Sequence, residues 1–250
     1  MSIEIIRCLQ DNYAYLVPGP EAGSWTLIDA PEAAPILAAL AAKGGKLTRI
    51  YLTHHHHDHI GAVPELVAAT GAEVYGAEAD AHRLPLLDHA FRPGDTLPGG
   101  AEVMDAPGHT LGHVAFHFPA LGALFSADSL MTHGCGRLFE GSADQMFDAI
   151  ARFNALPAAT RVLSGHDYAA ANLAFAARFA PDPAALAARQ AELPRLAAEG
   201  LPTTGTTLET ERLLNPYLRC HLPQVAAAAG LPGADPRSVL AEIRRQKDNA

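Results

Sequence analysis

The chain has 250 residues, of which 49% are hydrophobic and 18% are charged. This composition permits one large buried core, alone or with a smaller appendage, and argues against a disordered chain. The net charge of −9 argues against non-specific binding to nucleic acid, because such binding requires a basic surface.

The chain contains three cysteines, Cys8, Cys135 and Cys220, without the paired spacing of a disulfide framework. This favours a reducing compartment, and we expect a cytoplasmic protein. The first ten residues lack the basic and then apolar pattern of a secretion signal. No stretch approaches the ~18 apolar residues of a membrane span, so we expect no membrane partner. Nothing in the sequence requires more than a monomer.

Short apolar runs alternate with turn signals as far as the final predicted strand. In chain order they predict strands at 3–8, 13–17 and 25–28, a helix at 35–42, a strand at 50–52, a helix at 63–69, strands at 73–75, 102–104, 114–118 and 123–125, a helix at 142–155 and a last strand at 161–163.

The pattern then becomes helical, with breaks at proline and glycine, and no strand is predicted after Ser164. The predicted helices cover residues 169–179, 183–199, 208–214 and 238–247. We therefore predict an α/β domain over residues 1–168 and a smaller helical domain over residues 169–250.

Four of the predicted strands are followed within a few residues by histidine or aspartate. The strand at 50–52 leads into 53-THHHHDHIG-61, and the other three lead to His109, Asp128 and His166. In α/β folds, functional sites gather at strand ends, where loops converge on one rim. Any one of these residues could be an ordinary polar loop residue, but that interpretation predicts no correlation with strand ends. The joint pattern therefore indicates a functional site.

The spacing within the histidine tract suggests two sets of metal ligands. Alternate residues of an extended segment point the same way, so His54 and His56 can face one centre. Asp58 and His59 follow the turn of the chain and can serve a second centre. Imidazole and carboxylate ligands suit zinc, and also iron or manganese. With the ligands at the other strand ends there are too many for one tetrahedral ion, and they fit two ions bridged by Asp128.

The pattern His-x-His-x-Asp-His, followed by spaced His, Asp and His, resembles the metallo-β-lactamase superfamily. Within it the chain resembles the glyoxalase II (hydroxyacylglutathione hydrolase) family over nearly its whole length. The segments that carry the resemblance are 11-DNYAYLV-17, 53-THHHHDH-59, 107-PGHTLGH-113, 134-GCGRLFEGSADQM-146, 165-GHDY-168, 214-LNPYLR-219 and 244-RRQKD-248. The last two lie in the helical part and are not shared by the whole superfamily.

The resemblance implies an α/β fold, namely a four-layer αββα sandwich with a smaller all-α C-terminal domain. It implies hydrolysis of S-(2-hydroxyacyl)glutathione thioesters by a hydroxide held between two divalent metal ions. The expected substrate is S-D-lactoylglutathione, which gives D-lactate and glutathione in the second step of methylglyoxal detoxification. Zinc is the expected metal, with iron and manganese as alternatives.

The resemblance also implies roles for individual residues. The ligands it implies are His54, His56 and His109 for one metal, Asp58, His59 and His166 for the other, and Asp128 between them. Asp58 and Asp128 are the expected catalytic residues. The residues implied for glutathione binding are Arg137, Phe139, Tyr168, Arg244 and Lys247.

Some interpretations stay open in the sequence. Phe139 stands where the family often has an aromatic hydroxyl, and its ring offers no such hydrogen bond. The basic residues near Arg244 could bind an anion, or could simply favour the last turn of a helix. Asp29 could orient a histidine, or could be a turn residue before Pro31. The rival functions are a glutathione-linked sulfur dioxygenase with one iron, another hydrolase of the superfamily, and a non-catalytic metal-binding protein.

Overall fold

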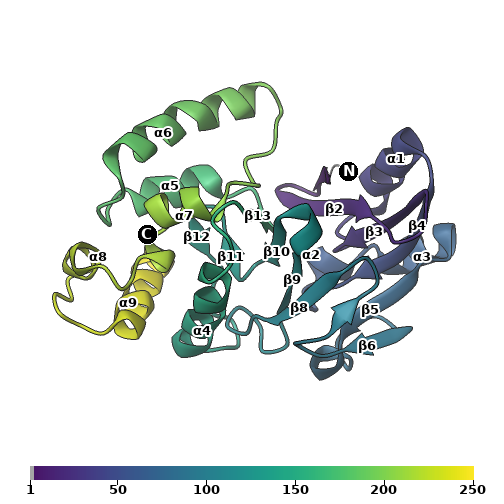
Figure 1. The fold of residues 1–250 in the computed structure, drawn as a ribbon, viewed down its shortest axis with the longest axis horizontal. Helices are drawn as coiled ribbons and strands as arrows, with labels where there is room; N and C mark the ends of the chain where they lie inside the picture. Colours follow the sequence, from purple (N-terminus) through teal and green to yellow (C-terminus); the bar gives the residue numbers. More distant parts are fainter. Residues whose placement is uncertain (1–2) are drawn as a thin grey trace. The chain divides into compact units, whose positions relative to one another are not determined.

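The computed structural model describes residues 3–250 (Figure 1). By the contacts among its residues the chain forms two compact units. The first contains the chain up to Asp105 together with Gly112–Phe125, and the second contains Ala106–Leu111 and Ser126–Ala250. Strand β10 (Ala123–Ala127) runs from the first unit into the second.

The first unit begins with a six-stranded sheet whose strands follow one another in chain order. The first three strands pair in antiparallel fashion and the last four in parallel fashion. Parallel neighbours require crossover connections, which include helices α1 and α3. The elements are β1 (Glu4–Cys8), β2 (Asn12–Pro18), β3 (Ser24–Ile28), α1 (Ala33–Lys43), β4 (Lys46–Tyr51), α3 (Val63–Thr70), β5 (Glu73–Ala77) and β6 (His89–Phe91).

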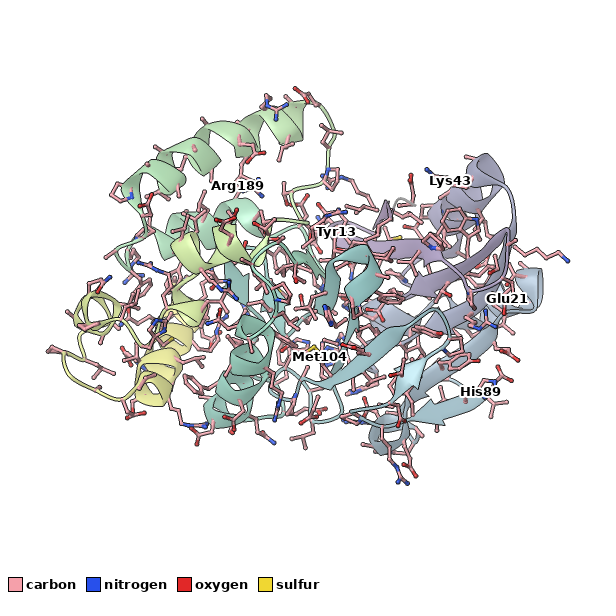
Figure 2. The ribbon with its side chains drawn as sticks, in the orientation of Figure 1. Tyr13, Glu21, Lys43, His89, Met104 and Arg189 are labelled. Atoms are coloured by element: carbon pink, nitrogen blue, oxygen red, sulfur yellow. The ribbon has the colours of Figure 1, made fainter. Side chains whose placement is uncertain are left out.

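Helices α1 and α3 pack on one face of this sheet. Ile36 and Leu66 are fully buried there, in one apolar cluster with Leu27 and Ile50 from the strands. At the edge of the unit, Glu21 (Figure 2) forms a two-pronged ion pair with Arg49. The apolar side chains of the strands thus have a helical cover, which is the arrangement expected of a parallel sheet.

The second sheet of this unit is antiparallel and packs against the first through aromatic rings. Tyr15 of the first sheet meets Phe125 of the second with ring centroids 5.2 Å apart, and Tyr51 meets Phe116 at 5.6 Å. The four rings are buried, so the two sheets share an apolar interior. The first unit contributes β7 (Thr96–Leu97), β8 (Ala101–Asp105), β9 (Val114–Phe118) and the first part of β10 to this sheet, whose fifth strand is β13 (Arg161–Ser164).

The longer segment of the second unit starts at the end of β10. The N–H of Gly165, just after β13 (Arg161–Ser164), donates to the carbonyl of Ala127, 3.0 Å away. A short hairpin follows Asp128, and α4 begins with a capping box in which Ser142 and Gln145 satisfy each other's backbone N–H groups. These elements are β11 (Leu130–Met131), β12 (Gly134–Cys135) and α4 (Ala143–Asn154).

The rest of the second unit is helical, and α9 lies beside α4 (Figure 1). Helix α6 contacts both α5 and α7, and Arg189 comes from α6 (Figure 2). None of the helices over residues 3–250 is long and apolar enough to cross a membrane. The helices are α5 (Ala169–Ala176), α6 (Pro183–Ala198), α7 (Leu208–Leu214), α8 (Pro223–Ala228) and α9 (Pro236–Asp248).

The predicted α/β class is confirmed, and each predicted strand and helix has a counterpart. No strand follows Ser164 within residues 165–250, also as predicted. The last helix begins earlier than predicted, at Pro236, because the Asp235 carboxylate accepts the N–H groups of Arg237 and Ser238. The elements that the sequence did not predict are short: α2 (His57–Ile60), β6, β7, β11, β12, α8 and the 3-10 helices η1 (Glu78–Asp80), η2 (Pro119–Leu121) and η3 (Pro216–Leu218). Such elements have too little pattern of their own, and tertiary pairing decides them.

Candidate metal and substrate site

The histidine tract begins where β4 leaves the first sheet. Helix α2 (His57–Ile60) is a single turn that reverses the chain after His56. The imidazole ring of His54 lies 4.7 Å from that of His56 and 4.3 Å from that of His59, measured between centroids. Three predicted ligands therefore lie together in the first unit, with His54 and His59 buried.

Asp29 orients one of these rings. Its backbone φ of 57° is left-handed, which is uncommon outside glycine. The carboxylate accepts hydrogen bonds from the N–H of Thr53 at 2.9 Å and from its hydroxyl at 2.8 Å, and lies 2.8 Å from Nδ1 of His59. A carboxylate can only accept, so Nδ1 of His59 carries the proton and Nε2 keeps its lone pair. Of the two interpretations of Asp29, the structure supports the one in which it orients a histidine.

Thr53 in turn determines which nitrogen of His54 carries a proton. Its hydroxyl proton is already donated to Asp29, and its oxygen lies 3.0 Å from Nδ1 of His54. The hydroxyl must therefore accept from Nδ1–H, which leaves the lone pair of His54 on Nε2. A single buried carboxylate thus sets the tautomers of two neighbouring histidines.

Asn12 holds the acidic residue of the tract. Its buried side chain donates from Nδ2 to Oδ2 of Asp58 at 2.9 Å and to the Asp58 carbonyl at 3.1 Å. His55, between two candidate ligands, has a different partner: its Nδ1 lies 2.9 Å from the buried carboxylate of Asp80. Alternation along the tract therefore separates the candidate ligands from a histidine that has a structural partner.

The second unit contributes Asp128, at the end of β10. Its Oδ2 lies 3.4 Å from Nε2 of His109 and 3.2 Å from Nε2 of His166. Nδ1 of His109 lies 2.9 Å from the carbonyl oxygen of Arg137, so this ring also donates through Nδ1 and presents Nε2. One carboxylate oxygen thus faces two imidazoles.

Gly136 lets the chain pass close to Asp128. A Cβ atom at this position would lie 1.9 Å from the carbonyl oxygen of Asp128 and 3.1 Å from Nδ1 of His109. Any other residue would displace the backbone beside two candidate ligands. The glycine in 134-GCGR-137 is therefore a packing requirement of the site.

Two exposed aromatic side chains lie beside candidate ligands of the second unit. Tyr168, which is 39% exposed, stacks on His166 with an interplanar angle of 6° and a centroid separation of 4.9 Å. Phe139, which is 63% exposed, meets His109 edge-on at 5.2 Å. Their rings provide apolar surface next to the imidazoles, and Arg137 is exposed in the same segment.

The two basic residues expected from α9 differ in their surroundings. Arg244 is buried and donates from Nη1 to the carbonyl of Cys135 and from Nη2 to Asp248, both at 2.8 Å. Lys247 is half-buried and donates to the carbonyl of Ala171 at 3.3 Å. Burial lowers the pKa of Lys247 from its ordinary value, and the positive charges of Arg244 and Arg137 lower it further. The second unit thus has a cluster of three basic side chains, which suits an anionic ligand.

Cys135 is not a nucleophile of this site. Burial raises the pKa of its thiol to about 11, although Arg244 acts in the opposite direction. The thiol therefore stays protonated at neutral pH, and a protonated thiol is a poor nucleophile.

Comparison with known proteins places the chain in a family. Residues 10–96 match the metallo-beta-lactamase superfamily, and residues 167–250 match the hydroxyacylglutathione hydrolase C-terminus. A protein of Fuscovulum blasticum named hydroxyacylglutathione hydrolase is 53% identical over 99% of this chain and 98% of its own length. The chain belongs to the hydroxyacylglutathione hydrolase family.

Solved structures share the fold of this chain. TTHA1623, crystallised in a di-iron-bound form, is 29% identical, with a TM-score of 0.64 over 87% of this chain and 100% of that one. The B3 metallo-beta-lactamase BLEG-1 is 22% identical, with a TM-score of 0.65 over 87% of this chain and 99% of that one, and shares the fold.

The ligand set in this member of the hydroxyacylglutathione hydrolase family fits divalent metal ions. Three of the imidazoles, those of His54, His59 and His109, have an acceptor at Nδ1, so Nδ1 carries a proton and Nε2 is the atom left to bind an ion, and carboxylates accompany them. Sequence reasoning missed three residues that hold these ligands or their neighbours: Asn12, Thr53 and Asp80. The motif 11-DNYAYLV-17 singled out Asn12, but nothing local in the sequence reveals its partner Asp58.

Proposed function

We propose that the chain hydrolyses S-(2-hydroxyacyl)glutathione thioesters, with S-D-lactoylglutathione giving D-lactate and glutathione. The observation that carries this proposal is Asp128, whose carboxylate faces Nε2 of two histidines in a full-length relative of hydroxyacylglutathione hydrolases. The hydrogen bonds at Nδ1 of His54, His59 and His109 support it, because they hold a proton on Nδ1 and orient each ring so that Nε2 is the atom left to bind an ion.

Two divalent ions are part of the proposal, with zinc as the expected metal and iron or manganese as alternatives. When bound, such ions supply Lewis acidity, which activates water as a nucleophile and polarises the thioester carbonyl. The proposed ligands are His54, His56 and His109 for one ion, Asp58, His59 and His166 for the other, and Asp128 for both.

The protein's own residues orient the reactants. Asn12 fixes the Asp58 carboxylate, which we assign to positioning the attacking water. Asp29 and Thr53 keep the histidine protons away from the ligand atoms. The leaving group is a thiolate with an ordinary pKa of ~8.5, so it can depart without a strong general acid.

Glutathione is held by the second unit in this proposal. Its carboxylates pair with Arg137, Arg244 and Lys247, whose charges are close enough to lower the pKa of the lysine. Tyr168 and Phe139 offer aromatic surface beside the candidate ligands. The helical domain over residues 169–250 therefore contributes to substrate binding. A cytoplasmic location is proposed as well, because all three cysteines are free thiols.

The test combines activity with metal content. Thioester cleavage of S-D-lactoylglutathione and bound metal are measured on the same sample, for the wild type and for Asp128→Ala. We expect about two ions per chain and rapid cleavage in the wild type, with both reduced in the variant. Asp144→Ala is the matched control, because its carboxylate is exposed and lies 3.7 Å from Arg237. A wild type that binds two ions and cleaves no glutathione thioester would refute the proposed substrate. One iron per chain with oxygen uptake on glutathione persulfide would indicate a sulfur dioxygenase instead.

A further inference from the structure

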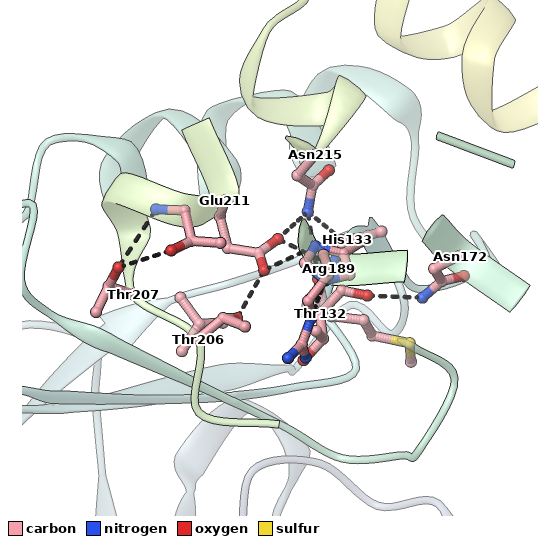
Figure 3. Close-up of polar contacts among 12 residues, drawn as sticks. Thr132, His133, Asn172, Arg189, Thr206, Thr207, Glu211 and Asn215 are labelled. Carbon is pink, nitrogen blue, oxygen red and sulfur yellow. Dashed lines mark hydrogen bonds and ion pairs between the residues drawn. The ribbon is translucent and has the colours of Figure 1, made fainter. Parts of the chain in front are cut away.

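The hairpin formed by β11 and β12 joins Asp128 to Arg137, and side chains from the helical part of the second unit hold its backbone. His133 in its turn is buried and has a left-handed φ of 58°. Every residue of the hairpin from 131 to 135 has a backbone N–H or C=O bonded to such a side chain. Figure 3 shows the contacts of Glu211, Asn215 and Asn172. The bonds run from Asn215 to the carbonyls of Met131 and Gly134, from Asn172 to that of Thr132, from Arg244 to that of Cys135, and from the N–H of His133 to Glu211.

Glu211 is the centre of this arrangement and is fully buried. Its Oε2 accepts the N–H of His133 at 2.8 Å and Nδ2 of Asn215 at 3.0 Å, and its Oε1 accepts the hydroxyl of Thr206 at 2.7 Å. Burial by itself raises the pKa of Glu211, but His133 and the hydrogen bonds from Thr206 and Asn215 outweigh it, so the pKa lies below its ordinary value. The carboxylate is therefore ionised and satisfied inside the protein.

The side chain of His133 links this carboxylate to a buried arginine. Nε of Arg189 donates to Nε2 of His133 at 2.9 Å, and Nδ1 of the same ring lies 3.1 Å from Oε1 of Glu211. A guanidinium can only donate, so Nε2 carries the lone pair and Nδ1 carries the proton that faces the carboxylate. The imidazole of His133 thus lies between the guanidinium of Arg189 and the carboxylate of Glu211.

The same arginine reaches the loop that contains His166. Nη2 of Arg189 donates to the carbonyl of Thr203 at 2.6 Å. The hydroxyl of Thr203 in turn donates to the carboxylate of Asp167, the neighbour of His166. Helices α6 and α7 are therefore connected by hydrogen bonds to two of the three segments of this unit that contain candidate ligands, those of Asp128 and His166.

We propose that Glu211 and Asn215 are positioning residues, which fix the segment from Asp128 to Arg137 in one conformation. This inference rests on the proposed function for its catalytic consequence. The segment contains two glycines, Gly134 and Gly136, so its own backbone is permissive. Removing the Glu211 carboxylate or the Asn215 amide would leave backbone groups of the hairpin without hydrogen-bond partners, and the hairpin would change conformation. A displacement of about 1 Å at a catalytic group can cost about 100-fold in rate.

The test compares Glu211→Gln with Arg212→Met, its neighbour on α7. Arg212 donates to the side chain and carbonyl of Asn154 and to the carbonyl of Leu156, so its loss also removes several hydrogen bonds, but none to the hairpin. Stability, metal affinity by competition with a chelator, kcat and KM are measured on folded protein, with amide hydrogen exchange at His133. We expect Glu211→Gln to accelerate exchange at His133, to weaken metal binding and to lower kcat/KM at least about tenfold. Arg212→Met is expected to lose stability while its kcat/KM stays within about twofold.

His133→Gly keeps the inference testable if Glu211→Gln fails to fold. Glycine adopts the left-handed φ at no steric cost, so this variant relieves strain while it removes the bridge between Arg189 and Glu211. The same faster exchange and weaker metal binding are expected. Unchanged metal affinity and exchange in the folded variants would overturn the inference, as would an equal loss of kcat/KM in Arg212→Met. A wild type without thioesterase activity would refute the proposed function alone, because metal affinity and exchange still report on the hairpin.

Discussion

Asp29→Asn is expected to weaken metal binding strongly while it leaves the metal-free fold almost unchanged. Asparagine tolerates the left-handed φ of 57°, so the substitution removes the charge without adding backbone strain. The consequence depends on which atom of the carboxylate becomes the NH₂ group, because the two oxygens have different partners.

If the NH₂ group replaces Oδ1, it faces the backbone N–H of Thr53, which cannot turn away. If it replaces Oδ2, it faces the Thr53 hydroxyl and Nδ1 of His59, and both can adapt. The hydroxyl then accepts from the amide and donates to Nδ1 of His54, and His59 likewise accepts at Nδ1. The groups that contact the new amide all keep a hydrogen bond in this second arrangement, so it is the one we expect. It moves the protons of His54 and His59 onto Nε2, the atoms that would bind metal.

The expected changes in stability and in metal affinity follow from this exchange of hydrogen-bond partners. The metal-free protein keeps its hydrogen bonds, so its free energy of unfolding should change by less than about 1 kcal/mol. Metal binding requires both protons to return to Nδ1 against the amide. Loss of a partner that orients a histidine ligand typically costs about 10- to 100-fold in metal affinity. This corresponds to ~1.4–2.7 kcal/mol per bound ion.

The assay measures the two quantities separately. Urea unfolding of metal-free protein gives the stability, and competition with a chelator gives the metal affinity. Asp95→Asn is the control, since its carboxylate accepts an exposed N–H of Arg92 at 2.7 Å in a turn of the same unit. Wild-type metal affinity in Asp29→Asn would refute the assignment of tautomers. So would a loss of several kcal/mol in the metal-free protein with metal affinity unchanged.

Three further predictions concern single substitutions. Gly136→Ala should lower kcat/KM by about 100-fold, because its methyl group would lie 1.9 Å from a carbonyl oxygen. Gly230→Ala is the control: its φ of 83° also makes alanine costly, but its Cβ would meet no atom within 4 Å, so this variant should keep wild-type kinetics. Equal losses of kcat/KM in Gly136→Ala and Gly230→Ala would contradict the prediction. Cys135→Ser should keep kcat/KM within about threefold, because a thiol with a pKa of about 11 is a poor nucleophile at neutral pH. A loss beyond about tenfold would show that the thiol takes part in the reaction. Glu21→Gln should reduce acid sensitivity, because the carboxyl pKa is lowered from 4.5 to about 2, first by hydrogen bonds from its arginine partner. The stability that the Glu21 carboxylate contributes is present above its ordinary pKa of 4.5 and is lost as the pH falls towards its pKa of about 2 in the folded protein. The urea midpoints at about pH 6 and pH 3 should therefore differ less in the variant than in the wild type.

The candidate ligands could be predicted because their signal is local. His54, Asp128 and His166 each follow a short apolar strand, and the strand pattern and the polar residue are adjacent in the chain. Metal chemistry then limits which side chains can serve. The predicted boundary at residue 168 stays a prediction. The roles of the glutathione-binding residues also stay predictions, because those roles depend on contacts with a substrate.

The local pattern of residues by itself determined the order of strands and helices, the helical character after residue 168, and the histidines and acids that end four strands. Tertiary structure alone decided which atom of each imidazole is presented, since Asp29 and His59 are 30 positions apart in the chain. It also decided what holds the hairpin, since Asn215 and Met131 are 84 positions apart. Periodicity reports on neighbours along the chain, whereas a hydrogen bond between distant residues forms only after the backbone has brought them together.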